Sequence, residues 1–193
     1  AVFGDVAGRT QIDDDTPQRP AMLYGRHKAM IEAWLATLGR RGDLHPLALR
    51  LPGLVARPGD GAGLKSAFLS DLFRAARDGQ SIRLPVSATA TSWLMSVRCA
   101  AENIVHALER SGQDEPDGAA VTLPALRVEM ASLVEALARR TGRAIAVDYA
   151  SDPAIERAFG SYPPLYTPTA DTLGFAHDGD LDRLVASALE DLA

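Results

Sequence analysis

Helical and strand-like apolar patterns alternate along this chain. Over residues 21–38 the apolar side chains recur every three or four positions, which predicts an amphipathic helix that Gly39 and Gly42 end. The same spacing predicts further helices at 64–77, 100–108 and 129–140. Asp152 followed by Pro153 predicts the start of a short helix at 153–159. Short apolar runs predict buried strands at 46–51, 81–85, 91–97, 120–123 and 145–149. Strands and helices in alternation indicate an α/β fold.

Polar segments connect these elements. Residues 5–20 are rich in Asp, Thr, Gln and Pro and predict a loop, which includes the acidic triplet Asp13-Asp14-Asp15. Three adjacent carboxylates of an extended loop cannot all converge on one ion, so no metal site is expected there. The Gly-rich run at 59–63 predicts a flexible connection, and 111–118 predicts a loop.

Composition excludes several classes of function. The chain has 193 residues, 47% of them hydrophobic, with a net charge of −5, which suits one or two small globular units. The acidic balance gives no support to binding of nucleic acid or a membrane surface. No apolar run approaches the roughly 18 residues of a membrane span. The single cysteine, Cys99, excludes an internal disulfide and a multi-cysteine metal site, and it fits a cytoplasmic location.

Tyr24 and Lys28 form the candidate catalytic pair. They are four residues apart on the first predicted helix, so they share one face, one turn apart. A nearby ammonium stabilises a phenolate, which favours proton transfer by a tyrosine at neutral pH. Ile31 and Leu35 follow on the same face, so we expect this face to turn inward, towards a sheet and a cofactor.

The order of motifs around this pair resembles a known family. An apolar run ends at Gly4, the acidic and Pro-containing loop follows, and then come Leu23-Tyr24-Gly25-Arg26-His27-Lys28 and Leu49-Arg50-Leu51-Pro52-Gly53. This order resembles the extended short-chain dehydrogenase/reductases, the NAD-dependent epimerase/dehydratase family. The stretches at 50–59 and 92–101 are most similar to its D-erythronate dehydrogenase branch, and 173–192 resembles the family's terminal helix module.

The resemblance implies a fold and a domain division. We expect the C-terminal part of a Rossmann-type, doubly wound parallel sheet together with a small α/β substrate-binding domain. Residues 1–56 would be the remaining catalytic part of the nucleotide-binding domain, and 57–193 mainly the substrate-binding domain, with a helix near 98–110 packing back on the Rossmann sheet. The family's glycine fingerprint for pyrophosphate does not occur in this sequence. We therefore expect it, and the catalytic Ser or Thr, to precede Ala1.

The resemblance also assigns roles to residues. Tyr24 would be the acid/base, and Lys28 would hold the nicotinamide ribose and stabilise the Tyr24 phenolate. The backbone from Pro52 through Gly53 and Leu54 to Val55 would meet the nicotinamide. The expected cofactor is NAD, with NADP not excluded because the residues that choose between them are absent.

Two departures from the family pattern bear on the substrate. Members that use nucleotide sugars carry an Arg that grips the phosphate where this chain has Ser92, followed by Trp93, and an Asn where it has Gly53. Without a bidentate phosphate clamp, a nucleotide sugar is disfavoured and a small sugar acid, similar to D-erythronate, is favoured. Its carboxylate needs a cation, and the candidates in the sequence are Arg57, Lys65 and Arg98.

The sequence predicts an NAD(P)-dependent oxidoreductase that oxidises a secondary hydroxyl of such an acid to the 2-oxo acid. Two alternatives stay open: a sugar or nucleotide-sugar epimerase or dehydratase of the same family, and a non-catalytic truncated binding module. The expected partner is a small molecule, without nucleic acid, membrane or metal. A homodimer is compatible with the sequence.

Overall fold

The computed structural model describes residues 1–57, 63–110 and 120–192. The loop predicted at 111–118 and the connection predicted at 59–63, apart from Gly63, lie outside these ranges. The elements in chain order are α1 (Leu23–Arg40), β1 (Ala48–Arg50), β2 (Gly53–Val55), α2 (Ala67–Asp78), β3 (Ile82–Leu84), β4 (Thr91–Ser96), α3 (Val97–Arg110), β5 (Ala120–Thr122), β6 (Leu126–Glu129), α4 (Met130–Thr141), β7 (Val147–Tyr149), α5 (Pro153–Phe159), α6 (Pro168–Thr172) and α7 (Leu181–Glu190).

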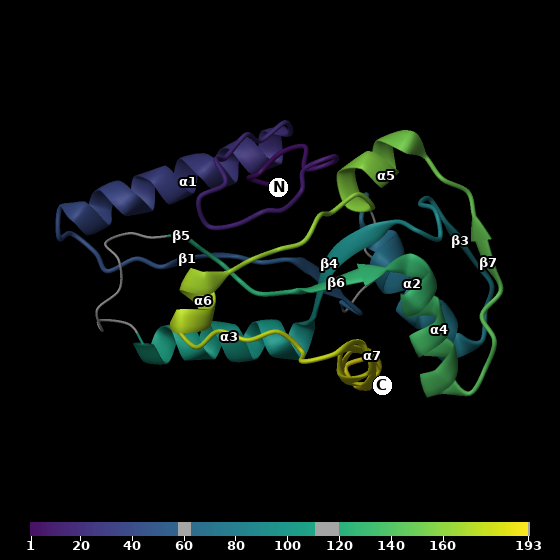
Figure 1. Cartoon of the computed structure of the whole chain (residues 1–193). Coiled ribbons are helices and arrows are strands. Elements are labelled where there is room, and N and C mark those ends of the chain that lie inside the picture. Colours follow the sequence, from purple (N-terminus) through teal and green to yellow (C-terminus); the bar gives the residue numbers. More distant parts are fainter. Residues whose placement is uncertain (58–62, 111–119, 193) are drawn as a thin grey trace.

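One end of the molecule is layered. Strands β1 and β5 pair in parallel, with Ala48 opposite Ala120, and lie between α1 on one side and α3 on the other (Figure 1). Cys99 and Ala100 of α3 pack with Val121 of β5 and with Phe175, which follows α6. A parallel pair with helices on both faces is the arrangement of an α/β fold.

The other end holds two further sheets. Strand β4 is central, with β2 parallel on one edge and β6 antiparallel on the other. Strands β3 and β7 form a separate parallel pair. Helices α2, α4 and α7 pack together beside these strands (Figure 1).

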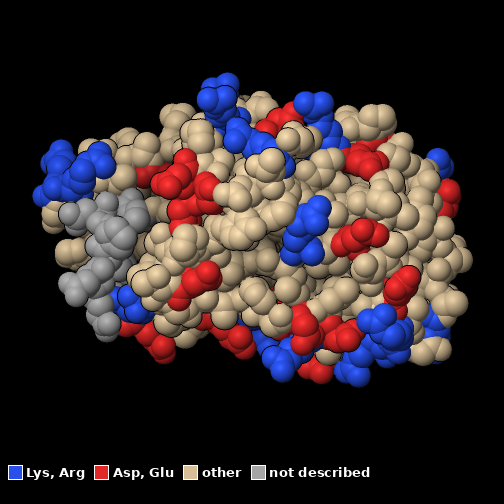
Figure 2. Space-filling view, in the orientation of Figure 1, with Lys and Arg blue, Asp and Glu red and all other residues tan. Residues whose placement is uncertain are grey.

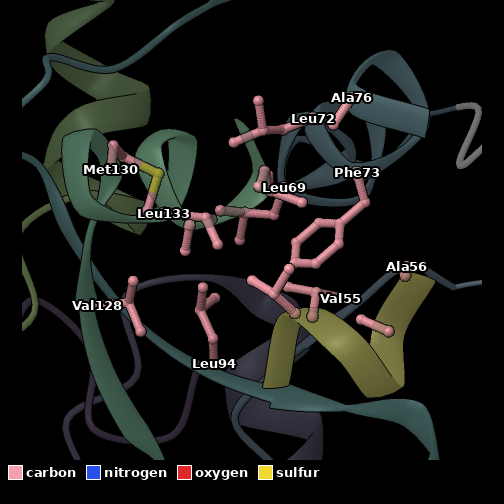
Figure 3. Packing of buried hydrophobic residues seen from close by; sticks show 14 of the residues in the cluster. Val55, Ala56, Leu69, Leu72, Phe73, Ala76, Leu94, Val128, Met130 and Leu133 are labelled. Atoms are coloured by element: carbon pink, nitrogen blue, oxygen red, sulfur yellow. The ribbon is translucent and has the colours of Figure 1, made fainter. Parts of the chain in front are cut away.

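The main core lies between β2, β4, β6 and the three helices. Leu69 and Phe73 of α2 meet Leu133 of α4 over the side chains of Leu94 and Val128 (Figure 3). Helices α2 and α4 both end at a glycine in the left-handed conformation, Gly79 and Gly142, as helices commonly do. This core fixes β2 and β4, whose residues line the candidate site described below.

The predicted α/β fold is confirmed, with local corrections. The sequence predicts that Pro52-Gly53 ends a strand, but a second strand, β2, begins at Gly53, because the chain leaves the β1–β5 pair and joins β4. The predicted helix at 129–140 begins at Met130 and is preceded by β6, which the sequence analysis misses. Its antiparallel pairing with β4 is a contact between distant segments.

The visible surface carries no stripe of one charge. Figure 2 shows acidic and basic side chains interspersed with uncharged surface. Among the described residues, no helix is both long and apolar enough to cross a membrane.

Candidate functional site

A cavity of about 360 Å³ lies between the N-terminal segment, the start of α1, β1, β2, β4 and the segment around α5. Its polar lining comes from Tyr24, Arg50, Arg57, Ser66, Ser92 and Thr122, together with the rings of Trp93 and Tyr162. Its apolar lining includes Phe3, Leu54, Leu69 and Phe159. A mostly apolar hollow with a few converging polar groups is typical of a small-molecule site.

Tyr24 and Lys28 lie together beside this cavity. The Lys28 Nζ atom is 5.4 Å from the centre of the Tyr24 ring, a distance at which a cation interacts with an aromatic face. Tyr24 lines the cavity from the first turn of α1. The cavity is therefore lined by a phenol whose ring has an ammonium beside it, although Lys28 itself is not among the described lining residues.

The expectation that this face turns inward is wrong for the described chain. Tyr24 is 62% exposed and Ile31 is 51% exposed, and α1 buries only Gly25. The helix packs through the side that carries Gly25 and Glu32, and no described element covers the Tyr24 side. The Tyr24 face is thus free to meet a ligand or further protein.

Close packing and one ion pair hold α1 in place. A Cβ atom at Gly25 would lie 2.5 Å from the carbonyl oxygen of Ala1, so only glycine fits where the N-terminal segment crosses the helix. On the same side Glu32 accepts hydrogen bonds from the Arg50 guanidinium, with 2.8 Å between Arg50 Nη2 and the nearer carboxylate oxygen. These contacts position Tyr24 at the mouth of the cavity.

The predicted nicotinamide segment forms a wall of the same cavity. Pro52, Gly53 and Leu54 line it, whereas Val55 is buried in the core. A Cβ atom at Gly53 would lie 2.9 Å from the carbonyl oxygen of Trp93, because β2 runs close to β4 there. The structure thus gives a packing reason for glycine at this position.

Ser92 and Trp93 of β4 also reach the cavity, but their polar atoms are engaged. The buried Ser92 hydroxyl donates to the carbonyl oxygen of Phe159, and Trp93 Nε1 donates to that of Pro163 at 2.7 Å. The Trp93 ring meets the ring of Tyr162 edge to face, with 4.7 Å between their centres. Burial raises the pKa of the Tyr162 phenol, which keeps it protonated.

The fold does not bring the three cations predicted to bind a carboxylate into one site. Arg57 lines the cavity, directly after β2. Lys65 is exposed and is not among the cavity-lining residues. Arg98 lies on α3 and pairs with Glu190 and Asp191 at the C-terminal end of α7, away from the cavity.

Sequence reasoning missed four polar lining residues: Arg50, Ser66, Thr122 and Tyr162. Arg50 stood within a recognised motif, but nothing local to it revealed its pairing with Glu32. Tyr162 precedes Pro163-Pro164, which predicts a rigid loop without saying where that loop packs. Two carboxylates of the acidic triplet hold the loop in place. Asp13 accepts a hydrogen bond from the Thr16 hydroxyl, and Asp14 accepts one from the backbone N–H of Thr169.

The described residues fit only part of a nicotinamide dinucleotide. Lys28 and Tyr24 are accessible to a ribose, and the wall from Pro52 to Leu54 offers backbone groups at the cavity. The glycine sequence pattern of a pyrophosphate-binding turn does not occur in the sequence. The residues of this chain would therefore hold the nicotinamide end alone.

Curated relatives match the chain along most of its length. It is 33% identical over 183 residues to D-erythronate dehydrogenase of Cupriavidus necator, covering 93% of this chain and 56% of the relative. It is 28% identical to D-erythronate dehydrogenase of Haemophilus influenzae, covering 98% of this chain and 61% of the relative. The chain thus spans little more than half the length of these relatives.

Solved structures share the fold. The holo form of GalE-like L-threonine dehydrogenase from Cupriavidus necator superposes with a TM-score of 0.84 at 17% identity, covering all of this chain and 64% of the other. The nucleoside-diphosphate-sugar epimerase from Agrobacterium tumefaciens superposes with a TM-score of 0.81 at 25% identity, covering 97% and 56%. The model of the NAD dependent epimerase/dehydratase family matches residues 1–120, well over half of the sequence. The chain therefore belongs to the NAD dependent epimerase/dehydratase family.

Proposed function

We propose that this chain is the catalytic and substrate-binding part of an NAD-dependent dehydrogenase that oxidises a secondary hydroxyl of a small sugar acid. The observation that carries the proposal is the Tyr24–Lys28 pair, with 5.4 Å between the ammonium and the ring centre, at the edge of a cavity of about 360 Å³. D-erythronate, oxidised to the 2-oxo acid, is the proposed substrate, supported by the two relatives named for it. Residues 1–56 would belong to the nucleotide-binding domain and 57–193 mainly to the substrate-binding domain.

In this proposal Tyr24 moves the proton. Its Oη atom accepts the proton of the substrate hydroxyl while the carbon that bears the hydroxyl becomes a carbonyl carbon. The Lys28 ammonium stabilises the phenolate form of Tyr24 that takes this proton. When bound, NAD supplies the hydride acceptor, and Lys28 would hold its ribose. The walls of the cavity orient the substrate and limit its contact with water.

Two features of the cavity favour a small acid over a nucleotide sugar. Its volume is near the lower end of the range of about 300–1,000 Å³ that is usual for ligand pockets. The buried Ser92 hydroxyl donates to the carbonyl oxygen of Phe159 and offers no charge to a phosphate. The family resemblance implies an Arg at this position in members that use nucleotide sugars. This also argues against the alternative of a nucleotide-sugar epimerase.

The test uses a fusion protein that joins this chain to a nucleotide-binding half. This chain is fused to the part of the Cupriavidus necator D-erythronate dehydrogenase that it does not match, and NADH formation from D-erythronate is followed. Replacing Tyr24 by Phe removes one oxygen without changing packing, so turnover should fall by about 10²–10⁴-fold while NAD still binds. Tyr166→Phe is the control, since Tyr166 is exposed and lies outside the cavity.

Three outcomes would contradict the proposal. Full activity of the Tyr24→Phe fusion would show that Tyr24 is not the acid/base. A folded fusion that ignores D-erythronate but converts a nucleotide sugar would support the epimerase alternative. A folded fusion that binds NAD and converts neither would favour a non-catalytic module.

A further inference from the structure

Among the lining residues that the structure describes, Arg57 is the arginine whose side chain has no partner. Two guanidinium groups line the cavity, those of Arg50 and Arg57. Arg50 is neutralised by Glu32 and also donates to the Thr122 hydroxyl at 3.3 Å. The Nε atom of Arg57 is buried without a hydrogen-bond partner, and among the described residues no hydrogen bond or ion pair joins the Arg57 side chain.

The backbone holds Arg57 at this place. The preceding residue, Ala56, lies in the core (Figure 3) and is fully buried. Its φ is 53°, a conformation that residues other than glycine rarely adopt. The Arg57 carbonyl oxygen accepts a hydrogen bond from Arg74 Nη2 at 2.8 Å, and its backbone N–H approaches the Ser70 hydroxyl at 3.4 Å. Helix α2 therefore fixes the backbone of Arg57 at two points and leaves its side chain to the cavity.

A buried guanidinium atom without an acceptor is costly, because its hydration is lost and nothing replaces it. Such a group is expected where a ligand supplies the acceptor. Leu69, Trp93 and Phe159 make much of the cavity lining apolar, and the lining residues that the structure describes include no Asp or Glu. The ligand expected beside Arg57 is therefore an anion, which would supply the missing hydrogen-bond acceptor.

We infer that Arg57 binds the carboxylate of the substrate and so sets the preference of the site for acids over neutral polyols. A carboxylate matches the flat fork of a guanidinium with two parallel hydrogen bonds. A diphosphate would need more positive charge than this single unpaired group. The inference rests on the proposed function in one respect, since it assumes that the acid is the substrate.

The test is binding to the chain itself, without NAD. Titration calorimetry compares D-erythronate with erythritol, which has the same number of carbons and no carboxylate, on the original chain and on Arg57→Gln. We expect the original chain to prefer D-erythronate and Arg57→Gln to weaken D-erythronate binding by about ten- to a hundredfold, with erythritol unaffected. Arg83→Gln is the matched control, because Arg83 is 76% exposed on β3, outside the cavity.

Melting temperatures separate binding from a structural role. Arg57→Gln removes no side-chain bond of the described chain, so its melting temperature should stay equal or rise, whereas a structural arginine would lower it. Arg57→Lys keeps the positive charge but lacks the planar guanidinium that donates two parallel hydrogen bonds. It should therefore bind D-erythronate with intermediate affinity.

The inference is overturned if Arg57→Gln binds D-erythronate as the original chain does, or if the original chain fails to prefer the acid. Loss of binding in Arg98→Gln in place of Arg57→Gln would also overturn it. Because no turnover is measured, Arg57-dependent binding of the acid would stand even if the fusion protein oxidised nothing, which separates this inference from the proposed function.

Discussion

The ion pair between Glu32 and Arg50 should control both stability and the position of Tyr24. Arg50 donates from Nε at 3.1 and 3.2 Å and from Nη2 at 2.8 Å, so both carboxylate oxygens are used. The two side chains are only 15% and 12% exposed. Since α1 buries only Gly25, this pair is a main polar link between the helix and β1.

Replacing Glu32 by Ala leaves the Arg50 guanidinium largely buried and uncompensated. Breaking a buried ion pair in this way costs about 3–5 kcal/mol of unfolding free energy. The lower figure applies here, because both side chains keep some exposure and Arg50 keeps its bond to Thr122. With a urea dependence of about 2 kcal/mol per molar, a loss of about 3 kcal/mol moves the unfolding midpoint down by about 1.5 M.

Urea unfolding followed by circular dichroism measures this shift. Glu109→Ala is the control, because Glu109 is an exposed residue of α3, and its change should stay within about 0.5 kcal/mol. The double variant Glu32→Ala/Arg50→Met should recover part of the loss, since no charge is then left buried. Equal midpoints for Glu32→Ala and Glu109→Ala would refute the reasoning.

Two further predictions concern packing and the thiol. Gly53→Ala should destabilise the chain by about 1–3 kcal/mol in the same urea assay, because its Cβ would lie 2.9 Å from the Trp93 carbonyl oxygen; an unchanged midpoint would show that β2 can move away. Burial raises the pKa of the Cys99 thiol to about 12, so labelling by a disulfide reagent at pH 8 should be at least about a hundredfold slower in the native chain than in urea. Equal rates would contradict the burial of Cys99.

The sequence predicted the features that depend on neighbouring residues. The spacing of Tyr24 and Lys28 placed them on one helical face, and the structure brings the ammonium to 5.4 Å from the ring centre. Asp152 followed by Pro153 predicted a helix start, and the Asp152 carboxylate accepts from the Ala154 backbone at 2.8 Å. Such features follow from sequence because the groups that make them are within one turn of each other.

Contacts between distant segments could not be predicted in this way. Strand β6 was missed, since its pairing with β4 joins positions more than thirty residues apart, such as Trp93 and Arg127. The Ser92 hydroxyl is engaged by Phe159, which is 67 positions away. A periodic pattern tells which side of an element is buried but not what lies against it.

The amino-acid sequence by itself therefore determined the α/β class, the family pattern and the pairing of Tyr24 with Lys28 on one helical face, all of which rest on local spacing and residue type. Only the tertiary structure decided which of the candidate cations, Arg57, Lys65 or Arg98, reaches the cavity. It did so because the turn at Ala56 and the contacts with α2 fix Arg57 there, while Arg98 is drawn to the carboxylates at the end of α7. All three side chains carry the same positive charge, so the sequence could not choose between them. The contacts that each makes in the folded chain distinguish them.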